Sequence, residues 1–114
     1  MFARITIIHV YLDRIDEAVE LYRKSFIPDA KKQKGYRGDV LLIDRKTGKG
    51  NSITFWESEK DAIANEENLF YQEQLVKFLT FFTAPLTIIR EGYEVAINTW
   101  GVPAKNKSTK KAKS

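Results

Sequence analysis

The chain has 114 residues, of which 43% are hydrophobic and 30% are charged, with no cysteine and a single histidine, His9. This length predicts one domain with one modest core, and the residue types exclude disulfides, cysteine zinc sites and a multi-histidine metal site within one subunit. The net charge of +4 arises near the C-terminus, because without the five lysines after Pro103 there are 14 basic against 15 acidic residues.

A nearly neutral folded part argues against specific nucleic-acid binding, which requires a basic face interleaved with aromatic side chains. We expect residues 101–114 to form a disordered, lysine-rich tail. The apolar run over residues 2–12 is too short to cross a bilayer and lacks the small-residue cleavage site of a signal peptide. The sequence therefore predicts a cytoplasmic protein with no membrane partner.

Residues 2–12 are rich in Ile, Val, Thr and Tyr and predict a first strand. Apolar residues at helical spacing then predict an amphipathic helix, with Asp13 as its N-cap and a bend or an end near Pro28. Two further strands are expected at 36–44 and 52–56. The two glycines between them predict a hairpin turn.

Ser58 predicts the N-cap of a short helix, which is interrupted at 65–68. A longer helix is expected to end before Pro85. Its predicted buried stripe consists of Leu69, Gln72, Val76, Leu79 and Phe82, with Phe70 and Phe78 flanking it. Residues 86–99 return to strand character, in two pieces that Gly92 divides.

The element order is therefore β-α-β-β-α-β, which predicts an α+β, ferredoxin-like fold with a four-stranded antiparallel sheet and helices on one face. The second face of the sheet must also be covered, because the chain has seven Phe, five Tyr and two Trp. Two-fold dimers are the commonest closed oligomers. We therefore expect a homodimer that presses two sheets together.

Four local motifs carry a more specific resemblance, which extends over residues 2–99. They are Phe2-Ala3-Arg4, Gly35-Tyr36-Arg37-Gly38, Asp44-Arg45-Lys46-Thr47-Gly48 and Trp56-Glu57-Ser58-Glu59. In order and spacing they resemble the antibiotic biosynthesis monooxygenase (ABM) domain superfamily of dimeric α+β barrels. The resemblance implies one ABM-like domain over residues 1–100, paired as a homodimeric barrel, with a small cavity in each subunit between sheet and helices.

The haem-degrading members of this superfamily use a cavity asparagine on the first strand, a tryptophan on the helix after the third strand, and a histidine ligand on the next helix. In this chain the first two positions fall near Thr6 and Asn65, and residues 66–82 contain no histidine. The resemblance therefore does not extend to haem degradation, and no cofactor is expected.

The polyketide oxygenases of the superfamily carry a tryptophan in a Trp-Glu-Ser motif, which Trp56 matches. Ser52 stands where they have an asparagine, and Ala62 where they have a tyrosine. The function that the resemblance implies is a cofactor-independent monooxygenase of a small aromatic or quinol-like substrate. The alternative is a non-catalytic dimeric domain that binds a small ligand or has a structural role.

His9 is the candidate general base because it is the only side chain with an ordinary pKa near neutrality, although strand alternation turns it away from Thr6. Trp56 either stacks on a flat substrate, as a second catalytic candidate, or belongs to the core. The candidate substrate-binding residues are Arg4, Thr6, Ser52, Thr54 and Trp56. The alternative for the first four is hydrogen bonding in the dimer interface. Tyr71 and Tyr93 are further candidate phenol donors.

Overall fold

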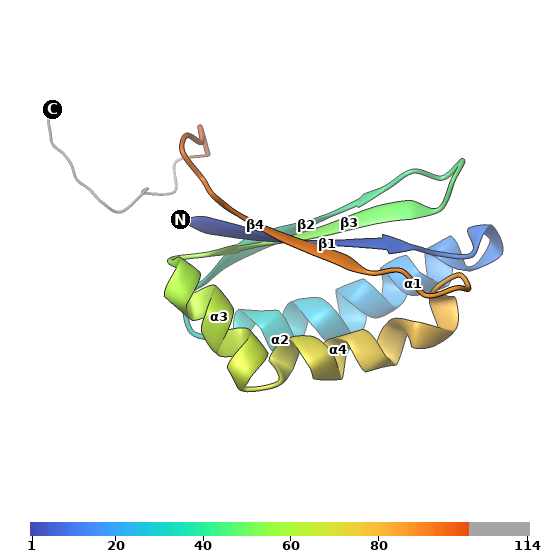
Figure 1. Ribbon diagram of the computed structural model, residues 1–114, viewed down its shortest axis with the longest axis horizontal. Coiled ribbons are helices and arrows are strands. Elements are labelled where there is room, and N and C mark those ends of the chain that lie inside the picture. The colour runs from blue at the N-terminus through green and yellow to red at the C-terminus, as the bar shows by residue number, and fades with distance from the viewer. Residues whose placement is uncertain (101–114) are drawn as a thin grey trace, which may run out of the picture.

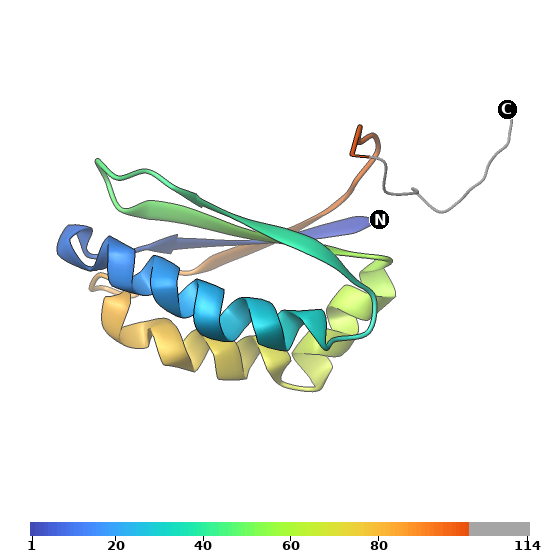
Figure 2. The same cartoon turned by 180° about the vertical axis from the view of Figure 1, so that it is seen from behind.

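Four strands form one antiparallel sheet in the order β2-β3-β1-β4, and the helices cover one of its faces (Figures 1 and 2). The strands are β1 (Phe2–His9), β2 (Tyr36–Ile43), β3 (Lys49–Trp56) and β4 (Ile89–Glu94). The computed structural model describes residues 1–100, so the predicted tail at 101–114 lies outside the described residues. The predicted α+β, ferredoxin-like fold is confirmed.

β4 is one strand and not the two predicted pieces. Gly92 pairs with Arg4 of β1 in the middle of the ladder, without a bulge. β1 is shorter than predicted and ends at His9. Val10 then forms only an isolated bridge to Phe82.

The first helical region is continuous but changes its hydrogen-bonding pattern along its length. Its segments are a 3₁₀ turn (Leu12–Arg14), α1 (Ile15–Leu21), a π-helical stretch (Tyr22–Phe26) and α2 (Ile27–Lys31). Of the two alternatives predicted at Pro28, the end is wrong, because Pro28 is the second residue of α2. The π-helical stretch ends at Phe26, two residues before this proline, which has no N–H to donate. The predicted Asp13 N-cap is also wrong, since Asp13 lies inside the 3₁₀ turn.

The second helical region consists of α3 (Glu59–Glu67), α4 (Phe70–Phe78) and a 3₁₀ turn (Leu79–Phe81). The predicted N-cap is confirmed, because the Ser58 hydroxyl accepts a hydrogen bond from the Asp61 N–H at 3.2 Å. The predicted buried stripe is wrong over most of its length. Leu69, Val76 and Leu79 are exposed, Val76 to 65%.

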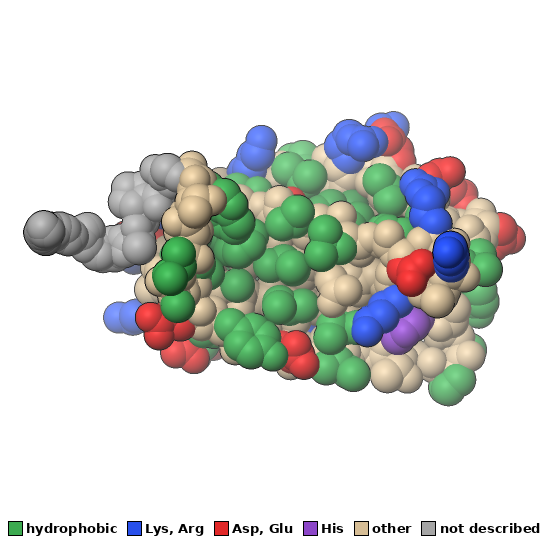
Figure 3. Space-filling view, turned by 90° about the horizontal axis from the view of Figure 1, so that it is seen from above, with side chains coloured by type: hydrophobic (Ala, Val, Ile, Leu, Met, Phe, Trp, Pro, Cys, Tyr) green, Lys and Arg blue, Asp and Glu red, His purple; other side chains and the backbone are tan. Residues whose placement is uncertain are grey.

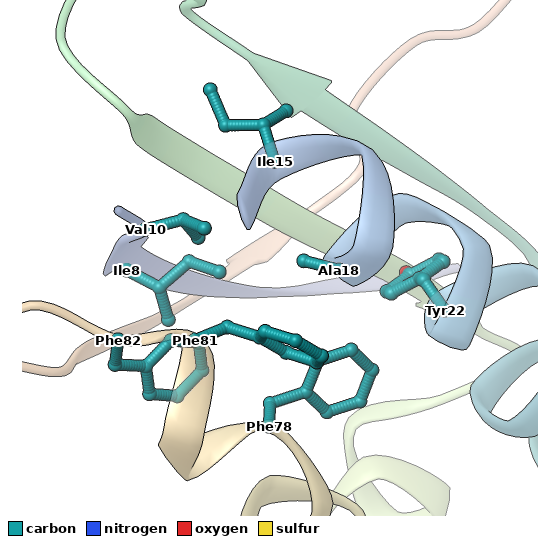
Figure 4. Close-up of a cluster of buried hydrophobic side chains, with 8 residues drawn as sticks. All are labelled: Ile8, Val10, Ile15, Ala18, Tyr22, Phe78, Phe81 and Phe82. Carbon is teal, nitrogen blue, oxygen red and sulfur yellow. The ribbon is translucent and has the colours of Figure 1, made fainter. Parts of the chain in front are cut away.

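The buried face of this region is aromatic. Phe70, Phe78 and Phe81 point inward together with Gln74, and three large rings remove more apolar surface from water than the aliphatic stripe would. In the main core cluster, Phe78, Phe81 and Phe82 lie with Ile8 of β1, with Val10 just after it, and with Ile15 and Ala18 of α1 (Figure 4). The core therefore lies between the sheet and the helices.

The other face of the sheet is open and apolar, and we call it the open face. Its side chains come from all four strands and include Ile5, Ile7, Val40, Leu42, Ile53, Phe55, Ile89 and Tyr93. Figure 3 views this face directly, with hydrophobic side chains gathered over its centre and charged ones toward the rim. Trp100 packs edge-on against Phe55, with 5.0 Å between ring centroids.

Candidate functional site

Two adjoining cavities lie between the sheet and the helices. The first, the apolar cavity, has a volume of about 70 Å³ and is lined chiefly by Ile8, Ala18, Tyr22, Leu41, Leu75 and Phe78. The second, the polar cavity, has a volume of about 40 Å³ and is lined by Arg4, Thr54, Trp56, Asn65 and Arg90 among others. The two share the wall formed by Thr6, Phe26, Ser52 and Tyr71. Together they form a pocket that is apolar at one end and cationic at the other.

The five candidate substrate-binding residues all line the polar cavity. They lie there because the β1–β3 register pairs Arg4 with Thr54 and Thr6 with Ser52, and alternate residues of a strand share a face. This is the face that the helices cover. These side chains are therefore not available to an interface between open faces, and their role in substrate binding stays a prediction.

Trp56 is buried at the end of β3, where its ring meets that of Tyr36 edge-on at 6.2 Å between centroids. It belongs to the core and at the same time forms part of the wall of the polar cavity. The two interpretations of Trp56 therefore do not exclude each other.

Sequence analysis did not identify Tyr22 as a site residue. Its hydroxyl lies 2.9 Å from the Ser52 hydroxyl, across the gap between the helix and β3. Burial raises the pKa of Tyr22 well above its ordinary value, so the phenol stays neutral and serves as a hydrogen-bonding group. The sequence feature that could have indicated this role is that Tyr22 carries a hydroxyl on the apolar, buried face of the predicted helix.

Arg90 and Glu66 were also missed. The Arg90 Nη1 donates to Glu66 Oε2 at 2.7 Å, and the Arg4 Nε lies 3.5 Å from the same oxygen. The guanidinium of Arg90 covers the Tyr71 ring, 3.4 Å from its centroid, and burial lowers the pKa of Arg90. The sequence feature that could have indicated this group is that Arg90 is the only arginine of β4 and lies on the face that the helices cover.

His9 does not line either cavity. It follows Ile5 and Ile7 on the open face, next to Lys49 of β3 in the ladder (Figure 3). The alternation that sequence analysis identified therefore places this imidazole on the opposite side of the sheet from Thr6. Tyr71 lines both cavities, whereas Tyr93 is exposed on the open face. Catalytic roles for His9 and Trp56 stay predictions.

Two further findings concern metals and membranes. Within residues 1–100, no group of three or more His, Asp or Glu side chains is arranged to hold a metal ion. In the same part of the chain, no helix has both the length and the apolar character needed to cross a bilayer.

No protein-family model and no curated protein matches the sequence, whereas solved structures match the fold. The chain is similar to a monooxygenase from the gene ActVA-Orf6 of Streptomyces coelicolor in complex with nanaomycin D (TM-score 0.64, 16% identity, 86% of this chain and 91% of that one). It is similar to the heme-degrader MhuD of Mycobacterium tuberculosis with two hemes bound in its active site (TM-score 0.64, 17% identity, 87% and 99%).

A third similar structure is an antibiotic biosynthesis monooxygenase (TM-score 0.60, 15% identity, 80% of this chain and 96% of that one). At these identities the likeness concerns the fold alone. The chain therefore has an ABM-like fold, as the four sequence motifs implied.

Proposed function

We propose that this protein binds a small, flat aromatic molecule in the two joined cavities and acts on it as a cofactor-independent monooxygenase of phenol- or quinol-like substrates. The observation that carries the proposal is the apolar cavity, walled by aromatic rings and carrying the Tyr22–Ser52 hydroxyl pair. A flat ring fits such walls, and the hydroxyl pair offers hydrogen bonds to its oxygen atoms. The fold likeness to a monooxygenase in complex with nanaomycin D supports it.

The proposed reaction uses O₂ and a phenol whose para ring position carries hydrogen. A C–O bond forms at that carbon, and the O–O bond breaks. One oxygen atom becomes a quinone carbonyl, and the other leaves as water with the hydrogens of the phenolic O–H and the ring C–H. The substrate is oxidised and O₂ is reduced, so no further reductant is required.

In this proposal, the chain contributes orientation, a dry pocket and charge rather than a general base. Within residues 1–100, the side chains that line the two cavities include no His, Asp, Glu or Lys. The neighbouring guanidinium groups of Arg4 and Arg90 favour an anionic substrate. The substrate reacts with O₂ as its phenolate, because deprotonation makes the ring richer in electrons. We therefore expect the rate to rise with pH through the pKa of the substrate phenol.

The alternative is a domain that binds the same kind of molecule without catalysis. It is favoured by the same lack of a titrating base among the cavity-lining residues.

Oxygen uptake distinguishes the two functions, with 1,5-dihydroxynaphthalene as the probe and calorimetry as a parallel measurement of binding. If the protein is a monooxygenase, we expect oxygen uptake above the protein-free rate, with 5-hydroxy-1,4-naphthoquinone and water as products. Under this function, Ser52→Leu should abolish oxygen uptake, because the larger side chain fills the space at the wall that the two cavities share. The matched surface variant Ser25→Leu should retain oxygen uptake. Binding without uptake supports the alternative, and the absence of both contradicts both functions.

We also propose that two copies of the chain pair through their open faces. Monomeric proteins rarely leave so large an apolar surface in water. The rim carries both signs of charge, with Lys49 at one end and Glu91 on β4. Two identical faces therefore bring an apolar centre and rim charges of both signs to the proposed interface.

A further inference from the structure

At the polar cavity, two buried donors make no hydrogen bond. The Nε atoms of Arg4 and Arg90 are buried and, within the part of the chain that the structure describes, neither makes a hydrogen bond. Arg4 Nε has only the distant ion pair with Glu66 Oε2, at 3.5 Å. Buried donors without partners are rare because each has lost its contacts with water and gained nothing in exchange. Two such donors at one cavity indicate that an acceptor is missing there.

The charge at this place is also unbalanced. Arg4 and Arg90 both form ion pairs with the same oxygen of Glu66, which lies on α3. Two guanidinium groups against one carboxylate leave a residual charge of one positive unit. This charge lies where burial already disfavours the protonated form of Arg90 and lowers its pKa. One further negative charge would balance the group.

The two arginines are held in place by their surroundings. Arg90 lies flat on the Tyr71 ring, and Arg4 covers the ring of Phe2. Gly92, opposite Arg4 in the ladder, leaves the space that the guanidinium occupies, because a Cβ there would lie 2.8 Å from Arg4 Nη1. The donors therefore do not have to be ordered when an anion binds.

The size of the cavity limits the anion. A volume of about 15 Å³ admits one water molecule, so the 40 Å³ of the polar cavity admits a small planar group. A carboxylate is planar, carries one negative charge and matches the geometry of guanidinium donors. A phosphate dianion is bulkier and would over-compensate the residual charge.

We propose that the polar cavity binds the carboxylate of an aromatic acid, whose ring occupies the adjoining apolar cavity. The position of the ring rests on the proposed function. The carboxylate accepts hydrogen bonds from the two Nε–H groups and lies beside Thr54, while Glu66 keeps its hydrogen bond from Arg90 Nη1. The substrate class is thus narrowed from phenols in general to phenols that carry a carboxylate.

The test compares ligands that differ only at the acid group, on the unmodified protein. The probes are 1-hydroxy-2-naphthoate and its neutral amide, 1-hydroxy-2-naphthamide. We expect the acid to bind at least about tenfold more tightly, as charge-assisted hydrogen bonds predict. In NMR spectra, the Nε–H signals of Arg4 and Arg90 should shift and exchange more slowly with water when the acid is added.

Variants assign the preference to these two side chains. Arg4→Gln and Arg90→Gln should each reduce the preference for the acid over the amide to about twofold or less. Arg37→Gln is the matched control, because Arg37 is exposed and pairs with Glu57 at 2.9 Å, outside both cavities. It should keep the full preference.

Equal binding of acid and amide in the unmodified protein would overturn the carboxylate site and leave the aromatic cavity standing. Preference for the acid that persists in both glutamine variants would also overturn it. If neither probe binds, the proposed function and the carboxylate site both fail. The ligand comparison and the NMR measurement need no variant, so a misfolded variant does not affect them.

Discussion

Tyr22 shows how one side chain joins the core to the candidate site. Its ring stacks on Phe26, with 4.6 Å between centroids, and its hydroxyl reaches Ser52 on β3. Burial raises its pKa, so the fold favours the neutral phenol over the phenolate. This preference contributes stability below the ordinary pKa of tyrosine, and the contribution is lost as pH rises above it.

We therefore predict that Tyr22→Phe makes the protein less sensitive to alkali. The free energy of unfolding, measured with urea, should fall between pH 8 and pH 11 in both proteins. The fall should be about 1 kcal/mol smaller in the variant than in the unmodified protein. Tyr11→Phe, at an exposed tyrosine, is the control and should behave like the unmodified protein. Equal losses in Tyr22→Phe and the unmodified protein would contradict this account.

At the level of elements, the junction between α3 and α4 depends on one residue in an unusual conformation. Leu69 has φ of 68°, in the left-handed region that favours glycine. Asn68 supports the turn, because its side-chain oxygen accepts a hydrogen bond from the Phe70 N–H at 3.0 Å. The Leu69 side chain is exposed, so it gains little from packing.

Replacing this leucine should stabilise the protein. We predict that Leu69→Gly raises the free energy of unfolding by about 0.5–1 kcal/mol, because glycine adopts positive φ without steric cost. Val76→Gly, at an exposed position inside α4, is the matched control and should lower it by about 1 kcal/mol. Thermal and urea unfolding measure the stability of both variants. A loss of stability in Leu69→Gly would show that the leucine is not strained.

The helices also show where periodicity alone fails. The Leu69, Val76 and Leu79 stripe has the correct spacing for a buried face, yet the residues on it are exposed. A second apolar face, formed by Phe70, Phe78 and Phe81, lies beside it on the same helical region. Which of the two faces is buried depends on the shape and the side chains of the sheet surface against which the helix packs. A local sequence pattern holds no information about that surface.

For the whole molecule, the open face is the feature that the isolated chain leaves unexplained. It extends over all four strands and carries exposed Val40, Leu42, Ile89 and Tyr93. Pairing with a second copy would bury this surface and close two sheets into one barrel-like core. The helices, and with them both cavities, would remain on the outer sides of such a dimer.

Charge introduced on the open face should therefore disrupt pairing. We predict that Leu42→Lys weakens dimerisation at least about a hundredfold, because an unpaired ammonium would have to be buried. Val76→Lys adds the same charge to the exposed side of α4, at a position that is 65% exposed, and should remain dimeric. Native mass spectrometry and sedimentation measure the oligomeric state of both variants. A monomeric unmodified protein would contradict the proposed pairing.

The sequence by itself determined the element order, the α+β class and the face on which each strand residue lies. These features depend on short-range patterns, namely alternation along strands, turn glycines and the Ser58 cap. For this reason strand alternation and the family motifs were enough to group Arg4, Thr6, Ser52, Thr54 and Trp56. The same alternation predicted that His9 faces away from them.

Only the tertiary structure decided which helix face is buried and which distant side chains complete the site. Tyr22 meets Ser52 across thirty residues of sequence, and Arg90 meets Glu66 across twenty-four. Such pairs depend on how far each helix is rotated about its axis and where it lies over the sheet. Rotation and position are set by the packing of large rings such as Phe78, which is a property of the assembled layers and not of any one segment.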